Sequence, residues 1–294
     1  MSDSTDRPST SAAPASRPGR LPTFLIIGVQ KSGTTSIYNY LKRHPQIFMS
    51  PVKETNFFER EWTQELPEVL ARRKTPINTL ADYTQLFVGA TDEIALGEAS
   101  PNYMFHHQRS VELIHAQIPD AKLIAVLRNP VERAYSDYLM NVRDAVGKQH
   151  RSLAEQVKTR GESSYVLLKG KYTDSIQHFI DVFGADQVQV FLYDDLRKDA
   201  IAFMQQMYEF IGVDTTFTPD TSRKAQTAQV PKNQALNRLL KTENPVRSAA
   251  SGLLRVLLPA AARARLRSQV ISLNSGSKKQ GLSAEDRALL QDYY

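Results

Sequence analysis

The sequence contains no cysteine, which excludes disulfide bonds, zinc–thiolate sites and cysteine nucleophiles. It also lacks an apolar run long enough to span a membrane as a helix. Residues 1–20 contain no aromatic residue and are rich in Ser, Thr, Pro and Ala. This composition predicts a disordered tail without the apolar core of a secretory signal. Because the absence of cysteine agrees with a reducing compartment, we expect a cytoplasmic protein.

Residues 21–294 are long enough to form one domain with a substantial core. Within them, residues 221–294 hold 13 Lys/Arg against 4 Asp/Glu, a balance of +9. We interpret this excess as a solvated basic face with cofactor-binding residues; an anionic substrate or a membrane surface is the alternative. The segment 221–282 is less regular and is a candidate acceptor-side subregion. No nucleic-acid partner is expected, because no motif with the appropriate spacing occurs.

The stretch 246–267 is apolar and rich in arginine. Such a segment fits a helix that lies on a membrane surface, which would allow peripheral contact with lipid. It also fits a packed helix whose arginine side chains reach out to water, and we favour this second interpretation. The sequence does not indicate an oligomeric state.

Strand and helix patterns alternate along the chain. Near-continuous apolar runs at 24–29 and 122–127 predict buried strands, and a third apolar run at 188–193 predicts a further strand. Helical patterns follow or precede them, at about 34–44, from 130 onward, and at 172–183, 200–211 and 283–294. Alternation of this kind predicts an α/β fold with a parallel sheet.

A polar loop connects the first predicted strand to the first predicted helix. Its residues are Lys31, Ser32, Gly33, Thr34, Thr35 and Ser36. Successive backbone N–H groups and the positive end of a helix suit such a turn to an anionic phosphate. Gly33 permits close backbone approach, and Lys31 adds a full charge. The same pattern fits a helix-capping turn with a surface lysine, and the loop alone does not separate the two.

The spacing of this loop differs from that of a Walker A motif, G-x-x-x-x-G-K-[S/T]. Lys31 stands two residues before Gly33, and no Gly-Lys-Ser/Thr follows. The spacing therefore disfavours magnesium-dependent nucleoside triphosphate chemistry of the P-loop kinase type. At the end of the second predicted strand, Arg128 precedes Asn129 and Pro130, which suit the N-cap and the first position of a helix. Glu132 completes a pattern like a capping box with Asn129.

Five segments together resemble the sulfotransferase family, in particular the branch of heparan sulfate and related bacterial sulfotransferases. They are residues 28–36 (GVQKSGTTS), 51–58 (PVKETNFF), 97–103 (GEASPNY), 127–138 (LRNPVERAYSDY) and 169–172 (KGKY). The resemblance covers residues 24–212. It implies a P-loop-NTPase-like three-layer fold with a central, mostly parallel sheet flanked by helices. It also implies transfer of a sulfuryl group from 3′-phosphoadenosine 5′-phosphosulfate (PAPS) to a hydroxyl or amine.

The resemblance also implies roles for individual residues. Lys31 would contact the bridging oxygen and the sulfuryl group, and residues 32–36 would cradle the 5′-phosphate. Arg128 and Ser136 would bind the 3′-phosphate, and Glu54 would be the general base. The residue patterns support Lys31 and Arg128 independently, because both flank helix N-termini. Ser136 rests on the resemblance alone; otherwise it is an ordinary helix serine.

Alternatives remain at several positions. Glu54 also fits a surface salt bridge with its neighbour Lys53, and a histidine base at His106 or His107 would replace it. We predict that His44 is structural. The aromatic pair Phe57 and Phe58 is expected in the core. For the family's cofactor loop near the C-terminus, the pairs 223–224 and 278–279 are candidates, although we interpret both as surface charge.

The expected reaction is in-line transfer without a metal, because Lys31 and the loop amides would neutralise the departing phosphate. The acceptor is a glycan, a lipid or a small molecule. In the heparan branch a lysine commonly stands where this sequence has Ala99, so a sulfated polysaccharide acceptor is disfavoured. A non-catalytic module that binds nucleotides or polyanions is a further alternative, and the intact Lys31, Arg128 and Glu54 argue against it.

Overall fold

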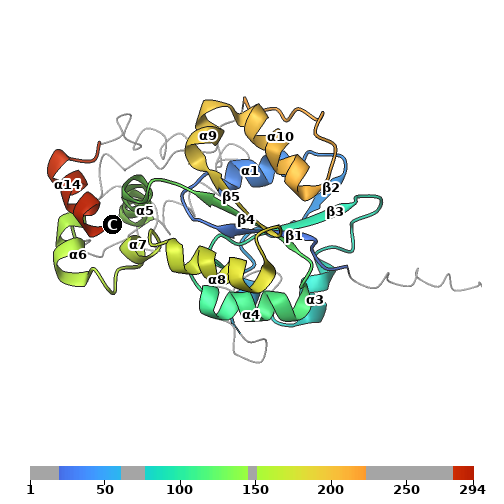
Figure 1. Cartoon of the computed structure of the whole chain (residues 1–294), viewed down its shortest axis with the longest axis horizontal. Coiled ribbons are helices and arrows are strands. Elements are labelled where there is room, and N and C mark those ends of the chain that lie inside the picture. The colour runs from blue at the N-terminus through green and yellow to red at the C-terminus, as the bar shows by residue number, and fades with distance from the viewer. Residues whose placement is uncertain (1–19, 61–76, 145–150, 223–280) are drawn as a thin grey trace, which may run out of the picture.

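The computed structural model describes residues 20–60, 77–144, 151–222 and 281–294. In these ranges five parallel strands form one sheet in the order β2-β3-β1-β4-β5, between two layers of helices (Figure 1). The strands are β1 (Phe24–Gly28), β2 (Ile47–Met49), β3 (Ala95–Ala99), β4 (Lys122–Leu127) and β5 (Val188–Leu192). The predicted α/β fold with a central parallel sheet is therefore confirmed, and β1, β4 and β5 are the three strands that the sequence predicted.

Two groups of helices cover the faces of the sheet, and a third group lies beside it (Figure 1). On one face are α1 (Thr34–Leu41), α9 (Tyr193–Lys198) and α10 (Ala200–Ile211). On the other are the 3-10 turn η1 (Phe57–Glu59), α3 (Leu80–Gln85), α4 (His107–Gln117) and α8 (Thr173–Phe183). The group beside the sheet comprises α5 (Pro130–Asp144), α6 (Leu153–Arg160), α7 (Tyr165–Leu168) and α14 (Ala284–Tyr293).

The central strand β1 is buried on both faces, as its unbroken apolar run predicts. Leu25 and Ile27 belong to the core cluster that packs against α4 and α8. Phe24 and Ile26 belong to the cluster on the opposite face, which packs against α1 and α10. Because each of these side chains is at most 1% exposed, its burial contributes roughly 1.5–3 kcal/mol.

The sequence did not predict β2 or β3. β2 is only three residues long, too short for a periodic signal. β3 carries Gly97 and Glu98 inside a fully buried strand, and both residue types are depleted in strands. β3 forms because β1 supplies a partner, with Phe24 opposite Gly97 and Ile26 opposite Ala99, and β2 in turn pairs with β3.

The topology brings four loops to one edge of the sheet. β1 lies in the middle of the sheet, between β3 and β4. After β1 the chain forms β2 and β3 on one side of β1, and after β3 it crosses over to form β4 and β5 on the other side. The carboxyl ends of parallel strands meet at the same edge, and ligands bind in α/β folds where the strand order reverses. The loops that follow β1, β2, β3 and β4 therefore enclose the expected site.

Several predictions concern residues outside the described ranges. These are the tail at 1–20 apart from Arg20, most of the subregion 221–282, the stretch 246–267, and the candidate pairs 223–224 and 278–279. The division into a tail and one domain thus stays a prediction. Each helix of the described ranges is too short or too polar to cross a membrane.

Gly97 marks the tightest contact between β1 and β3. A Cβ atom at this position would lie 2.2 Å from the Phe24 ring and 2.5 Å from the Met49 sulfur. Both neighbours are buried core side chains that cannot move aside without disturbing the packing.

We expect Gly97→Ala to lower the free energy of unfolding by about 1–3 kcal/mol, the usual cost of overpacking a core. Urea denaturation followed by circular dichroism measures this change. Gly89→Ala is the matched control, because a Cβ there would come no closer than 3.4 Å to the Phe48 ring. Equal stability of the two variants would contradict the close β1–β3 contact.

Candidate functional site

The loop after β1 forms an anion-binding turn at the N-terminus of α1. Gly33, the N-cap of α1, has a φ of 79°, and a Cβ there would lie 2.9 Å from the Tyr193 and Leu196 side chains. Within the described residues no side chain caps α1, and its first turn contains no acidic residue. The positive end of the helix and its N–H groups are thus left for a ligand.

Ser32 provides the clearest indication of a ligand in this loop. Its side chain is completely buried, yet its hydroxyl has no hydrogen-bond partner among the described residues. A buried hydroxyl without a partner is costly, so such groups in native proteins usually meet a ligand or water. Thr34 is also buried, Ser36 is partly exposed and Thr35 is exposed. The loop therefore fits a phosphate group.

Lys31 and Arg128, the two predicted cationic residues of the site, are in contact through the Lys31 backbone. The guanidinium of Arg128 donates from Nη1 to the backbone oxygen of Lys31 at 3.0 Å. The Lys31 ammonium extends to the sulfur of Met140 on α5, at 3.2 Å. A loop after β1 and a helix after β4 are thus joined through these two side chains, which the sequence separates by almost one hundred residues.

Arg128 is partly buried between an aromatic ring and a carboxylate. Its guanidinium stacks on Tyr193, 5.0 Å from the ring centroid, and its Nη2 lies 3.8 Å from Oε2 of Glu132. The other oxygen of Glu132 is 2.6 Å from Nη2 of Arg287 on α14. Burial lowers the pKa of Arg128 below its usual very high value. Since Glu132 is shared between two arginines, part of the Arg128 charge remains available to an anion.

The N-terminus of α5 is capped as predicted, but by a single residue. Asn129 Oδ1 accepts hydrogen bonds from the N–H groups of Val131 and Glu132, at 3.1 and 3.3 Å. In a capping box the Glu132 carboxylate would accept a hydrogen bond from the Asn129 N–H. Here this carboxylate contacts Arg128 and Arg287 instead. Ser136 is partly exposed on α5. It precedes Met140 by four residues and so shares the helix face that meets Lys31.

Glu54 lies on the loop after β2, at the same edge of the sheet. Its N–H donates to the backbone oxygen of Ala99 at 2.8 Å, and its backbone has a φ of 59°. The carboxylate contacts Lys53 Nζ at 2.5 Å and is 42% exposed. The salt bridge with Lys53 is thus present. It leaves the carboxylate open to solvent, where an acceptor would approach.

The predicted structural residues occupy the core. Phe57 and Phe58 are fully buried. His44 is buried as well; its Nδ1 accepts from the N–H of Gln46, and its Nε2 lies 2.8 Å from the backbone oxygen of Asp214. Of the alternative bases, His107 contacts His178 through their Nδ1 atoms at 3.0 Å.

Two carboxylates near Glu54 were not identified from the sequence. Glu98 on β3 is completely buried and accepts a hydrogen bond from Ser100 at 2.6 Å. Glu59 has one buried oxygen that finds no hydrogen-bond partner in the part of the chain that the structure describes, and its other oxygen is 4.0 Å from His106 Nε2. Burial raises the pKa of Glu59 to about 8 and that of Glu98 to about 7. Neither glutamate belongs to a sequence motif that would identify it as a site residue.

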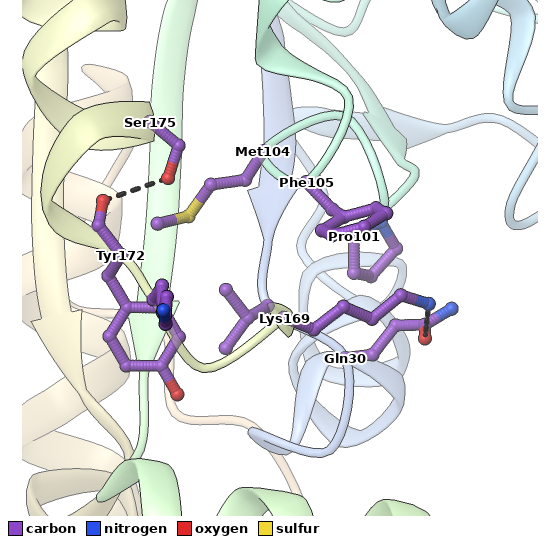
Figure 2. A pocket seen from close by; sticks show the side chains of 9 residues that line it. Gln30, Pro101, Met104, Phe105, Lys169, Tyr172 and Ser175 are labelled. Atoms are coloured by element: carbon purple, nitrogen blue, oxygen red, sulfur yellow. Dashed lines mark hydrogen bonds between the residues drawn. The ribbon is translucent and has the colours of Figure 1, made fainter. Parts of the chain in front are cut away.

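Lys169 lies in the turn between α7 and α8, against the loop after β1 that carries Lys31. Its ammonium donates to the Gln30 side-chain oxygen at 2.7 Å (Figure 2). It also donates to the Asn102 side-chain oxygen at 3.0 Å. It also lies 5.5 Å from the centroid of the Phe105 ring. A pocket opens here, lined among others by Gln30, Phe105, Lys169 and Tyr172 (Figure 2).

The comparisons with known proteins agree with this geometry. A family model described as the sulfotransferase family matches residues 22–218, and the chain belongs to this family of enzymes. Heparan sulfate glucosamine 3-O-sulfotransferase 6 of Homo sapiens is 30% identical over 226 residues, 74% of this chain and 60% of that protein. Carbohydrate sulfotransferase 15 of Mus musculus is 34% identical over 253 residues, 66% of this chain and 44% of that protein.

A solved structure of a bacterial relative shares the fold. The sulfotransferase from Alicyclobacillus acidocaldarius superposes with a TM-score of 0.61 at 33% identity, over 70% of this chain and 87% of that one. The chain spans 60% and 44% of the length of the two curated relatives described above. The family match argues against the P-loop kinase alternative, in agreement with the missing Walker A spacing.

We expect Glu59→Gln to flatten the dependence of thermal stability on pH. The raised pKa means that the folded protein keeps a proton that the unfolded chain releases above pH 4.5, so stability falls as pH rises toward about 8. The neutral amide removes this loss. At pH 8–9 we expect a gain of at least about 1 kcal/mol, or roughly 2–4 °C in Tm.

Differential scanning fluorimetry from pH 5 to pH 9 checks this expectation. Glu112→Gln is the control, because its carboxylate is 66% exposed. Parallel curves for Glu59→Gln and the unaltered protein would contradict a raised pKa for Glu59.

Proposed function

We propose that this protein transfers a sulfuryl group from PAPS to a hydroxyl or amine of a glycan. The observation that carries the proposal is the meeting of Lys31 and Arg128 at the uncapped N-terminus of α1. Such a site offers two cationic groups for two phosphates, and PAPS carries a phosphate at each end of its ribose. The family supports the donor, since sulfotransferases use PAPS.

The donor supplies a sulfuryl group joined to its 5′-phosphate through a bridging oxygen. Residues 32–36 and the N-terminus of α1 hold the 5′-phosphate, with the buried Ser32 hydroxyl finding its partner there. Arg128, just before α5, and Ser136, on α5, hold the 3′-phosphate. Lys31 lies between the two groups and stabilises the charge that develops on the bridging oxygen.

Glu54 acts on the acceptor. It takes the proton of the attacking hydroxyl or amine while the new bond to sulfur forms and the bond from sulfur to the bridging oxygen breaks. Adenosine 3′,5′-bisphosphate (PAP) leaves with the electron pair of that bond. The partly exposed position of Glu54, beside the β3 loop, supports this role because an acceptor reaches it from solvent.

The names of the relatives support a carbohydrate acceptor. One is called a glucosamine 3-O-sulfotransferase and another a carbohydrate sulfotransferase. Ala99 is buried on β3, so no positive charge from that position would meet a polyanionic chain. We therefore propose a glycan with few sulfate groups. A lipid or a small alcohol or phenol is the alternative acceptor, and a cytoplasmic location remains our prediction.

Incubation with radiolabelled PAPS and a panel of acceptors tests this function. The panel contains unsulfated and sulfated glycans, lipids and small phenols or alcohols. We expect label on an unsulfated glycan, and label on lipids or phenols alone would overturn the glycan assignment. Stabilisation of the protein by PAP but not by ATP with magnesium would separate the proposal from a kinase. PAP binding without transfer to any acceptor or to water would support a non-catalytic binding module instead.

Substitution of the two proposed catalytic residues tests their roles. We expect Glu54→Gln to reduce turnover by ~10²–10⁴-fold, the usual contribution of a general base. Lys31→Ala should reduce it by ~10²–10³-fold through loss of leaving-group stabilisation. PAP affinity of Glu54→Gln should stay near that of the unaltered protein in calorimetry. Near-normal turnover of Glu54→Gln would remove this residue from the mechanism, and Glu112→Gln serves as the surface control.

A further inference from the structure

Lys169 carries a positive charge that the described residues do not neutralise. Its ammonium has three N–H donors, and two of them are used by the neutral amide oxygens of Gln30 and Asn102. Among the described residues, no carboxylate lies within salt-bridge distance of this ammonium. A charge that is taken out of water normally finds an opposite charge, so an anion is the missing partner.

The Lys169 side chain is only partly exposed to water. Burial lowers the pKa of Lys169, an effect that Asp137, Glu59 and Glu54 oppose from a distance and Arg133 reinforces. These carboxylates influence the lysine without touching it. The nearest contacts remain two amides and the face of the Phe105 ring.

The position of the ammonium identifies which anion it would meet. Gln30 is the residue before Lys31, so its side chain belongs to the donor loop. Asn102 belongs to the loop after β3, and Ala99, the last residue of β3, accepts a hydrogen bond from the Glu54 N–H. Lys169 therefore links the loop after β1, through Gln30, to the loop after β3, through Asn102. The sulfuryl group must pass between these two.

We propose that Lys169 is a catalytic residue that binds an oxygen of the transferring sulfuryl group, opposite Lys31. This inference rests on the proposed function. Lys31 would stabilise the bridging oxygen, while Lys169 would stabilise the equatorial oxygens, which carry negative charge throughout in-line transfer. The amides of Gln30 and Asn102 fix the ammonium in position, so that little reorganisation is needed during the reaction.

Lys122 offers a matched control because its surroundings are similar and its location is different. Its ammonium donates to the backbone oxygens of Phe210 and Ile211, at 2.7 and 3.2 Å, and lies 5.7 Å from the Phe210 ring centroid. It stands at the first residue of β4, at the opposite edge of the sheet from the site. There it neutralises the negative end of α10, which supplies those carbonyl groups.

The test compares Lys169→Met, Lys169→Arg and Lys122→Met in the full chain. Radiolabelled PAPS reports the rate of sulfate release, to water or to the acceptor found in the panel, and calorimetry reports PAP affinity. We expect Lys169→Met to reduce the rate by ~10²-fold while PAP affinity stays within about threefold, because PAP lacks the sulfuryl group. Lys169→Arg should recover most of the rate. Lys122→Met should lower only the melting temperature.

Two outcomes would overturn the role of Lys169 while leaving the proposed function intact. The first is a rate for Lys169→Met close to that of the unaltered protein. The second is a loss of PAP affinity in proportion to the loss of rate, which would indicate that Lys169 only holds the donor loop through Gln30. If the unaltered protein neither binds PAP nor releases sulfate, the proposed function fails and this inference fails with it.

Discussion

The site depends on the hydrogen bond from the Arg128 guanidinium to the backbone oxygen of Lys31. It joins the loop after β1 to the start of α5, which are far apart in the sequence. A hydrogen bond from a charged group is worth about 1.5–3 kcal/mol, enough to hold a short polar loop in one conformation. The Nη2 atom of Arg128 lies near the Glu132 carboxylate, and its guanidinium stacks on the Tyr193 ring. One side chain thus shapes the donor loop and still presents charge to a ligand.

Charge is divided across the site in a way that suits sulfuryl transfer. Lys31 and Arg128 lie on the donor side, around the N-terminus of α1, whereas Glu54 and Glu59 lie on the opposite side. Burial raises the pKa of Glu59 to about 8, so this carboxyl adds little negative charge to the site near neutral pH. Lys169 stands between the two sides, where burial lowers its pKa and neighbouring carboxylates act from a distance.

The C-terminal helix α14 completes the support of the donor side. Arg287 pairs with Glu132, which limits how closely that carboxylate can approach Arg128. Tyr294 donates a hydrogen bond to the backbone oxygen of Leu167 at 2.7 Å and packs so closely on Gly170 that no Cβ would fit there. Since Gly170 follows Lys169, the end of the chain helps to position the turn from which that lysine extends. α14 thus contacts both the start of α5 and the turn that carries Lys169.

The sequence by itself determined the strands β1, β4 and β5, the cap of α5 and the start of α14, because these features depend on local apolar runs and turn residues. It left the Lys31 loop open between a phosphate-binding turn and a helix-capping turn. The roles of Ser136 and Glu54 came from the resemblance to a family and not from local pattern. Only the tertiary structure placed β2 and β3, whose short or polar segments become strands through pairing with β1 and each other. It also decided the surroundings of Glu59, Glu98 and Lys169. Burial and partners across the fold set their charge states, and no spacing in the sequence records which loops meet at the edge of a sheet.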